Sequence, residues 1–226
     1  MSDIISEKRT RPFVESFVEN VRCTLIGDER VGKTSILLSY QADTYPSEYV
    51  KTEFDSYSKR TKYKDLSINL LLYDVGGQAD LESFEKLDRL QTDVFLLCFS
   101  VDDRTSFENV STKWLEMVKR CWLSPEDGQA KKSNRMSESD LMNPIVLLVG
   151  CKTDRKTDKS VIMKHSELVA RPLVTSKEAV TLSKSIEAYK YMECSARNGT
   201  GVGQIFTQVI KAVQERRNYF SSKRWV

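Results

Sequence analysis

The sequence predicts an α/β fold in which a doubly wound, mostly parallel sheet carries helices on both faces. Apolar runs of strand length alternate with stretches of helical periodicity, and most of these runs are near-continuous rather than alternating. Near-continuous runs are typical of strands buried on both faces of a parallel sheet. Because the strands and helices alternate along the chain, they indicate βαβ units.

The expected elements follow in chain order. Strands are expected at residues 21–27, 66–74, 93–100, 144–150 and 191–195. Helices are expected at residues 33–41, 106–123, 176–186 and 203–216. Thr175 and Glu178 have the spacing of a capping box for the third helix, and Thr105 or Ser106 is expected to cap the second.

A chain of 226 residues is long enough for one well-buried domain. We assign this domain to residues 21–216, after an N-terminal extension at 1–20 and before a short basic and aromatic tail at 217–226. Residues 124–143 form a polar, serine-rich insertion. It is either a partner-binding or phosphorylated loop or a tolerated surface insertion, and its composition favours the second.

Composition excludes several functional classes. A net charge of +3 is too small to indicate nucleic-acid binding, and a single histidine, His165, argues against a zinc site or a Ser/His triad. No apolar run approaches the ~20 residues of a membrane span, and the first ten residues lack the apolar stretch of a secretory signal. The five cysteines show no metal-binding spacing, so we expect reduced thiols and a cytoplasmic protein.

A phosphate-binding loop is indicated by the spacing G-x-x-x-x-G-K-T at Gly27, Gly32, Lys33 and Thr34. It follows an expected strand and opens an expected helix, as this motif requires. The glycines let backbone N–H groups surround phosphate oxygens, Lys33 would reach the β and γ phosphates, and the Thr34 hydroxyl would bind Mg²⁺.

A second loop, DVGGQ, follows the strand at 66–74. Here Asp74 is expected to hold Mg²⁺ through a water, Gly77 to offer its N–H to a γ-phosphate, and Gln78 to orient an attacking water. Four of the nine glycines in the chain fall in these two loops. Backbone freedom is therefore concentrated where phosphate would be contacted.

Two tetrapeptides, CKTD at 151–154 and CSAR at 194–197, follow the last two strands. Both lie at the carboxyl edge of the expected sheet, where α/β folds bind ligands. The Asp154 carboxylate can accept hydrogen bonds from N1–H and the exocyclic amine of guanine, a pattern that adenine does not offer. Lys152 would cover the ring and the Ala196 N–H would meet guanine O6.

With these motifs the sequence resembles the Ras superfamily of small GTPases and, within it, the Rho family. The closer match lies in residues 45–57, 91–115 and 193–196, and residues 155–174 have about the length of the extra helical insert of Rho proteins. The resemblance covers roughly residues 21–213. It implies a P-loop small G domain with a six-stranded sheet, GTP or GDP and Mg²⁺ as ligands, and a role in signalling that includes cytoskeleton regulation.

The resemblance also implies individual roles. Tyr45 would pack edge-on against guanine, Tyr49 would close over the phosphates, and Thr52 would be the switch I ligand of Mg²⁺ and the γ-phosphate. Residues 52–57 would form the effector loop and residues 77–90 switch II. Effectors and exchange factors would bind through switch II and through switch I at Thr52, Glu53, Phe54 and Asp55.

The expected site residues fall into three groups by role. Gln78 is the candidate catalytic residue. The metal candidates are Thr34, Thr52 and, through water, Asp74. The nucleotide-binding candidates are Glu29, Arg30, Val31, Gly32, Lys33, Thr34, Ser35, Tyr45, Tyr49, Thr52, Gly77, Lys152, Asp154, Ser195, Ala196 and Arg197.

The phosphate loop departs from the Rho pattern at Glu29 and Arg30, where Rho proteins usually have Gly-Ala. A side chain at Glu29 should crowd Gln78 and an incoming arginine finger, which is worth about 10³ to 10⁵ in rate. We therefore expect GTP hydrolysis that is slow or resistant to an activating protein.

Other departures concern affinity and partners. Cys151 replaces the Asn or Thr of the base motif, which should lower nucleotide affinity somewhat. Val75 and Gly76 replace Thr-Ala and leave the binding groups of that loop in place. Lys51 and Glu53 replace a proline and an apolar residue in the effector loop, so the partners should differ from those of typical Rho proteins.

The carboxyl-terminal residues contain no prenylation box, so no prenyl anchor is expected. Arg216, Arg217, Lys223 and Arg224 lie among aromatic residues and would make weak peripheral contact with the inner face of a membrane at ~1 kcal/mol each. A helix end followed by a solvated tail is the alternative, and it is slightly favoured.

Three functions fit these motifs to different degrees. Gln78 favours a switch that binds effectors in its GTP state and hydrolyses GTP. Glu29 favours a constitutively GTP-bound interaction or scaffold protein. A P-loop phosphotransferase is disfavoured, because it would not explain DVGGQ, CKTD and CSA together.

Overall fold

A computed structural model describes residues 18–42, 52–77, 90–123, 143–167 and 172–223. Its strands are β1 (Val18–Ile26), β2 (Phe54–Tyr63), β3 (Leu66–Val75), β4 (Val94–Ser100), β5 (Ile145–Cys151) and β6 (Lys190–Glu193). Its helices are α1 (Lys33–Ala42), α3 (Arg104–Asn109), the π-helical turn η1 (Val110–Trp114), α4 (Leu115–Leu123), the 3₁₀ turn η2 (Thr153–Lys156), α5 (Lys159–Glu167), α6 (Ser176–Ser185) and α7 (Val202–Lys223).

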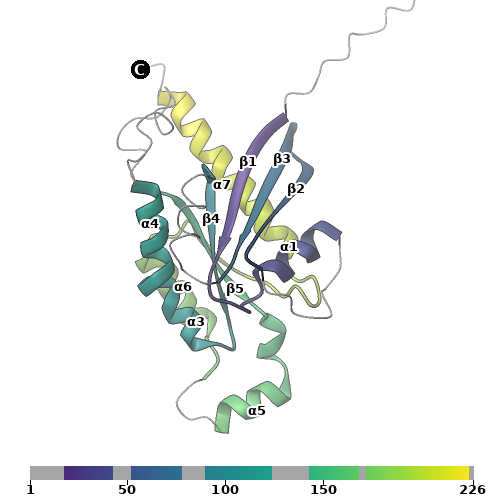
Figure 1. Ribbon diagram of the computed structural model, residues 1–226, viewed down its shortest axis with the longest axis vertical. Helices are drawn as coiled ribbons and strands as arrows, with labels where there is room; N and C mark the ends of the chain where they lie inside the picture. The colour runs from purple at the N-terminus through teal and green to yellow at the C-terminus, as the bar shows by residue number, and fades with distance from the viewer. Residues whose placement is uncertain (1–17, 43–51, 78–89, 124–142, 168–171, 224–226) are drawn as a thin grey trace, which may run out of the picture.

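The strands form one six-stranded sheet in the order β2-β3-β1-β4-β5-β6 (Figure 1). Strand β2 runs antiparallel to β3, and every other pairing is parallel. The expected α/β class and six-stranded sheet are confirmed. The five strands expected from the apolar runs correspond to β1, β3, β4, β5 and β6.

Strand β2 was not expected from hydropathy, because its sequence FDSYSKRTKY is largely polar. It is an edge strand in which half-buried and exposed side chains alternate over most of its length. Its ladder with β3 runs from Phe54 opposite Val75 to Tyr63 opposite Leu66. From Phe54 onward the expected effector loop at 52–57 is part of this strand.

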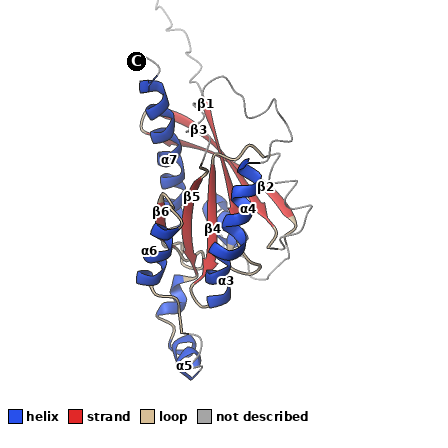
Figure 2. Ribbon diagram, turned by 90° about the vertical axis from the view of Figure 1, so that its left-hand side faces the viewer, coloured by secondary structure: helices blue, strands red, loops and turns tan. Residues whose placement is uncertain are grey.

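Helices cover both faces of the sheet (Figures 1 and 2). On one face, α1 and α7 pack on the buried side chains of β1, β3, β4 and β5, with Ile36 and Phe206 among their contributions. On the other face, η1 contributes Trp114, α4 contributes Val118 and α6 contributes Ala179 to a second buried cluster, and Phe107 of α3 packs against it. This arrangement agrees with the doubly wound topology.

Of the two helix caps expected from the sequence, the structure confirms one and contradicts the other. The capping box of Thr175 and Glu178 is confirmed at the start of α6. The expected cap of the second helix is wrong, because the Asp103 side chain accepts hydrogen bonds from the N–H groups of both Thr105 and Ser106. That helix was expected as one piece, and the π-helical turn η1 interrupts it.

Helix α7 continues to Lys223, so the segment expected as a tail after Arg216 begins as helix. No helix within the described ranges combines the length and hydropathy needed to cross a bilayer. The N-terminal extension up to residue 17, the insertion up to residue 142 and residues 224–226 lie outside the described residues.

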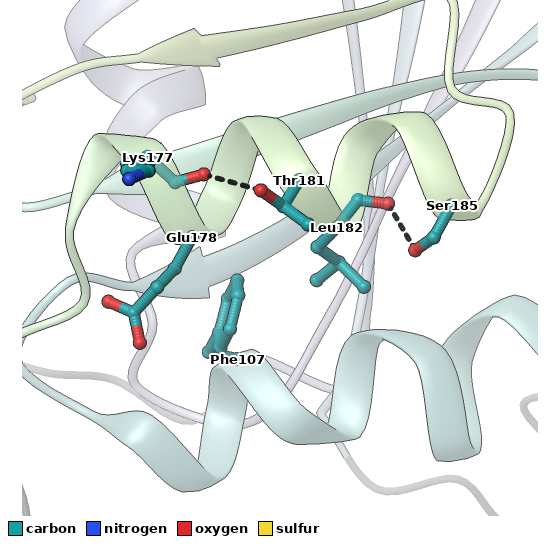
Figure 3. A pocket seen from close by; sticks show the side chains of 6 residues that line it. All are labelled: Phe107, Lys177, Glu178, Thr181, Leu182 and Ser185. Atoms are coloured by element: carbon teal, nitrogen blue, oxygen red, sulfur yellow. Dashed lines mark hydrogen bonds between the residues drawn. The ribbon is translucent and has the colours of Figure 1, made fainter.

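The carboxyl ends of the parallel strands meet at one edge of the sheet. The loops that follow β1, β3, β5 and β6 carry the four motifs of the sequence. Helix α5 projects from the body at the end opposite the carboxyl end of α7 (Figures 1 and 2). A shallow pocket of about 410 Å³ lies between α3 and α6 (Figure 3) and contains none of the motif residues.

Candidate functional site

The loop between β1 and α1 passes very close to strand β4. Gly27 has a φ of 151°, and a Cβ there would lie 2.1 Å from the backbone oxygen of Cys98. Only glycine fits this position. The loop then turns through Arg30, whose φ of 60° is left-handed, and enters α1 at Lys33.

Lys33 is buried beneath this loop. Its Nζ donates hydrogen bonds to the backbone oxygens of Gly27 at 2.7 Å and Asp28 at 2.9 Å. Burial lowers its pKa, and the negative charge of Asp74 partly opposes that shift. A desolvated ammonium held at a phosphate-type loop is well placed to pair with an anion.

Three oxygen-bearing side chains meet beside Lys33. Thr34 Oγ1 donates a hydrogen bond to Asp74 Oδ2 at 2.5 Å and lies 2.9 Å from Thr52 Oγ1. Asp74 is completely buried, and burial raises its pKa to about 6 although the Thr34 hydrogen bond and the Lys33 charge act in the opposite direction.

The second oxygen of this carboxylate, Asp74 Oδ1, is buried and accepts no hydrogen bond from the described residues. A buried carboxylate oxygen of this kind is costly unless it is neutralised. Hydroxyl and carboxylate oxygens are the ligands that Mg²⁺ prefers, and one or two carboxylates suffice beside substrate phosphates. Thr34, Thr52 and Asp74 therefore fit a magnesium ion.

The start of the DVGGQ loop packs against both neighbouring loops. The Gly76 N–H donates to the backbone oxygen of Glu53 at 2.9 Å. A Cβ on Gly77 would lie 2.1 Å from the Glu29 nitrogen, so the backbone of Gly77 rests directly on the phosphate loop. These contacts bring the loops after β1 and β3 and the segment before β2 together at one place.

The other two motifs also meet. Ser195 Oγ donates a hydrogen bond to Asp154 Oδ1 at 2.6 Å, and the Thr153 N–H donates to the backbone oxygen of Cys194 at 3.1 Å. Arg197 lies 3.9 Å from Asp154 Oδ2. Ser195 thus holds one carboxylate oxygen while the carboxylate faces the carboxyl edge of the sheet.

Lys152 was expected to cover the ring of a bound base. It has a φ of 60°, and its Nζ lies 4.0 Å from Asp102 Oδ1. Arg155 lies 3.6 Å from the other oxygen of the same carboxylate. Ala196, expected to meet guanine O6, is partly buried against the core.

The remaining candidates are placed as follows. Val31 is buried in the core, Glu29 and Ser35 are half-buried, and Arg30 is exposed. Cys151 is buried beneath the phosphate loop, with its Cβ 3.6 Å from the position of a Cβ on Gly32. Gln78, Tyr45, Tyr49 and Lys51 lie outside the described residues, so their roles stay predictions.

Two aspartates were missed by the sequence analysis. Asp28 accepts hydrogen bonds from Trp114 and Asn109, and Asp102 lies beside Lys152 and Arg155. Both contacts join parts of the chain that no local pattern relates. The one available signal for Asp28 was its position inside the phosphate-loop motif.

A comparison with protein-family models places this geometry in context. The model described as the Ras family matches residues 22–215, most of the chain and all four motifs. Members of this family are guanine-nucleotide-binding GTPases that act as molecular switches. The chain belongs to the Ras family of small GTPases.

Proposed function

We propose that this protein is a Rho-like small GTPase, a GTP/GDP- and Mg²⁺-dependent switch of intracellular signalling whose GTP hydrolysis is slow or resistant to an activating protein. The observation that carries the proposal is the meeting of Lys33, the Thr34–Thr52–Asp74 cluster and Gly77 at the carboxyl edge of the sheet. A ligand with several phosphates, bound together with a divalent cation, would supply binding partners for Lys33, for the oxygen cluster and for the Gly77 N–H.

In this proposal Lys33 keeps its hydrogen bonds to the carbonyl oxygens of Gly27 and Asp28 and directs its third N–H to the β and γ phosphates. Magnesium supplies charge neutralisation at those phosphates when it is bound. Thr34 and Thr52 offer hydroxyl oxygens to it, and Asp74 acts through a water. The free lone pairs of Asp74 Oδ1 support this assignment.

Asp154 selects guanine by accepting from N1–H and the exocyclic amine. The hydrogen bond from Ser195 at 2.6 Å fixes the carboxylate, so little ordering remains when the base arrives. Lys152, Ala196 and Arg197 complete the base side, and Tyr45 and Tyr49 are assigned to the base edge and the phosphates.

Slow hydrolysis is proposed from the place of Glu29. Its backbone touches Gly77, which directly precedes the catalytic candidate Gln78. A glutamate side chain at this junction competes for space with a water-orienting glutamine and brings negative charge near the γ-phosphate. Both effects oppose the transition state.

A Rho-like identity is supported by the range 155–174, which contains helix α5 standing out from the body (Figure 1). Effectors and exchange factors are proposed to bind switch I at Thr52, Glu53, Phe54 and Asp55 together with switch II. Because Glu53 and Lys51 depart from the Rho pattern, the effectors should differ from those of typical Rho proteins.

A cytoplasmic location with weak peripheral membrane contact is part of the proposal. Of the four basic residues named for this contact, two already bind other parts of the protein: Arg217 pairs with Glu19 at 2.8 Å, and Arg216 donates to the Asn143 backbone oxygen. The proposed membrane contact therefore depends mainly on Lys223 and Arg224. Sedimentation with anionic liposomes, with and without residues 215–226, tests this contact.

The alternative function is a constitutively GTP-bound interaction or scaffold protein, which Glu29 favours. Mass spectrometry of the nucleotide released from purified protein tests both functions, with Lys33→Ala as a control expected to carry none. GDP supports the switch, and GTP alone supports the alternative. Adenine nucleotide or an empty protein would contradict both.

A further inference from the structure

The carboxylate of Asp28, in the middle of the phosphate loop, is held on both oxygens by side chains at the ends of two consecutive distant elements, α3 and η1. Trp114 Nε1 donates to Oδ1 at 2.7 Å, and Asn109 Nδ2 donates to Oδ2 at 2.7 Å. The donors lie 81 and 86 residues away in sequence. Hydrogen bonds to an ionised acceptor are stronger than neutral ones.

The local backbone explains how two such donors reach one carboxylate. Asn109 and Trp114 are five residues apart, and in an α-helix they would be separated by about 140° around the axis. The turn η1 between them is π-helical, and the Leu115 N–H donates to the Val110 oxygen across five residues. This wider turn brings both side chains to the same face. Since π turns are rare and frequently lie at functional sites, a turn that aims two donors at one carboxylate points to a functional role.

Asp28 also touches the other parts of the site through its backbone. Its carbonyl oxygen accepts from Lys33 Nζ at 2.9 Å, and a Cβ on Gly77 would lie 2.6 Å from its carbonyl carbon. A shift of Asp28 therefore moves the expected partner of the phosphates and the first residue of switch II together. Trp114 is 1% exposed, so water cannot replace Asp28 as the acceptor of its indole N–H.

We propose that Asp28 is a positioning residue, which Trp114 of η1 and Asn109 at the end of α3 hold in place and which sets the rate at which nucleotide leaves the phosphate loop. The inference rests on the proposed function. It adds that the π-helical turn, and not the phosphate-loop motif alone, determines how firmly the loop grips its ligand.

The test measures the dissociation rate of a fluorescent GDP analogue from the full chain at saturating Mg²⁺. The variants are Asp28→Asn, which turns one acceptor into a donor, Trp114→Phe, which removes the N–H and keeps a buried ring, and their double variant. Ser111→Ala is the control, because its hydroxyl contacts only the Glu108 backbone oxygen among the described contacts. Unfolding temperatures of the nucleotide-free proteins are measured in parallel.

Each single variant should release the analogue at least about tenfold faster than wild type. The double variant should be no faster than the faster single variant, and Ser111→Ala should match wild type. Wild-type dissociation rates in Asp28→Asn and Trp114→Phe would overturn the inference, whatever their unfolding temperatures. Additive effects in the double variant would also overturn it, because they would mean that the two residues act separately. A wild-type protein that binds no guanine nucleotide would instead refute the proposed function.

Discussion

Gly77 rests on the backbone of Glu29 so closely that a Cβ on Gly77 would lie 2.1 Å from the Glu29 nitrogen. The contact joins the first residue of the expected switch II to the middle of the phosphate loop. It places Glu29, where Rho proteins usually have a glycine, next to Gly77, the residue that precedes Gln78. The size and charge at position 29 therefore bear directly on catalysis in our account.

Replacing Gly77 with alanine should force these two loops apart. The methyl group would also lie 2.6 Å from the Asp28 carbonyl carbon, and a backbone atom cannot move aside as a flexible side chain can. We expect Gly77→Ala to lose at least about tenfold in affinity for a GTP analogue and less for GDP, because only GTP carries the γ-phosphate that the Gly77 N–H is expected to contact. Titration of both nucleotides checks this, and equal losses for the two would show that the contact does not depend on the nucleotide state.

Asp154→Asn should impair guanine recognition. The amide offers one acceptor where the carboxylate offers two, and its N–H₂ would face the N1–H donor of guanine. Loss of a charge-assisted hydrogen bond predicts GDP binding weaker by at least about tenfold. Ser195→Ala removes the hydrogen bond to the Asp154 carboxylate and keeps the carboxylate, so its loss of GDP affinity should be smaller than that of Asp154→Asn. Competition between GDP and xanthosine diphosphate measures the base selectivity of both variants. Unchanged selectivity in Asp154→Asn would contradict the role assigned to Asp154.

Removal of magnesium should speed nucleotide release. Thr34, Thr52 and Asp74 converge within hydrogen-bond distance, and Asp74 Oδ1 has no partner in the described part of the chain. Excess EDTA should raise the dissociation rate of GDP from wild type by at least about tenfold. In Thr34→Ala the EDTA effect should be much smaller, because the metal site is already weakened. Equal EDTA effects in both proteins would exclude Thr34 as a ligand.

Stability should depend on pH through Glu193. Burial disfavours its ionisation, but hydrogen bonds from Lys156, Ser176 and Tyr191 outweigh burial and lower its pKa below 4.5. A lowered folded-state pKa stabilises the protein above the unfolded-state pKa, and this contribution is lost as pH falls through the folded-state value.

Glu193→Gln keeps an acceptor oxygen and removes the charge. It should lower the free energy of unfolding by about 1 kcal/mol at pH 7, and the difference should shrink toward zero in the acid range. Urea unfolding at several pH values from 7 to 3 checks the sign. A difference that grows as the pH falls would contradict this account of the network.

The sequence predicted the features that local patterns encode. Near-continuous apolar runs gave five of the strands, and the rule that ligands bind at the carboxyl edge of a parallel sheet brought Lys33, Asp74 and Asp154 to one edge. Strand β2 was missed because it lies at the sheet edge and is polar. An edge strand obtains its stability from the β3 ladder, which hydropathy does not report.

Contacts between distant parts of the chain were also missed. The bond of Asp28 to Trp114 spans 86 residues and depends on a π-helical turn that no propensity predicts. Asp103 rather than Thr105 or Ser106 caps α3, because its carboxylate reaches two N–H groups at once. Helix α7 passes Arg216, and Arg217 within its last turns pairs with Glu19 of β1 at 2.8 Å, a contact that hydropathy does not report.

Single-turnover GTP hydrolysis by wild type and Glu29→Gly tests the central claim most directly. Glu29→Gln separates the effect of charge from that of size, and Glu116→Gln, at an exposed position of α4 outside the site, is the control. We expect Glu29→Gly to hydrolyse GTP at least about tenfold faster than wild type, with Glu116→Gln close to wild type. Equal rates for wild type and Glu29→Gly would contradict it.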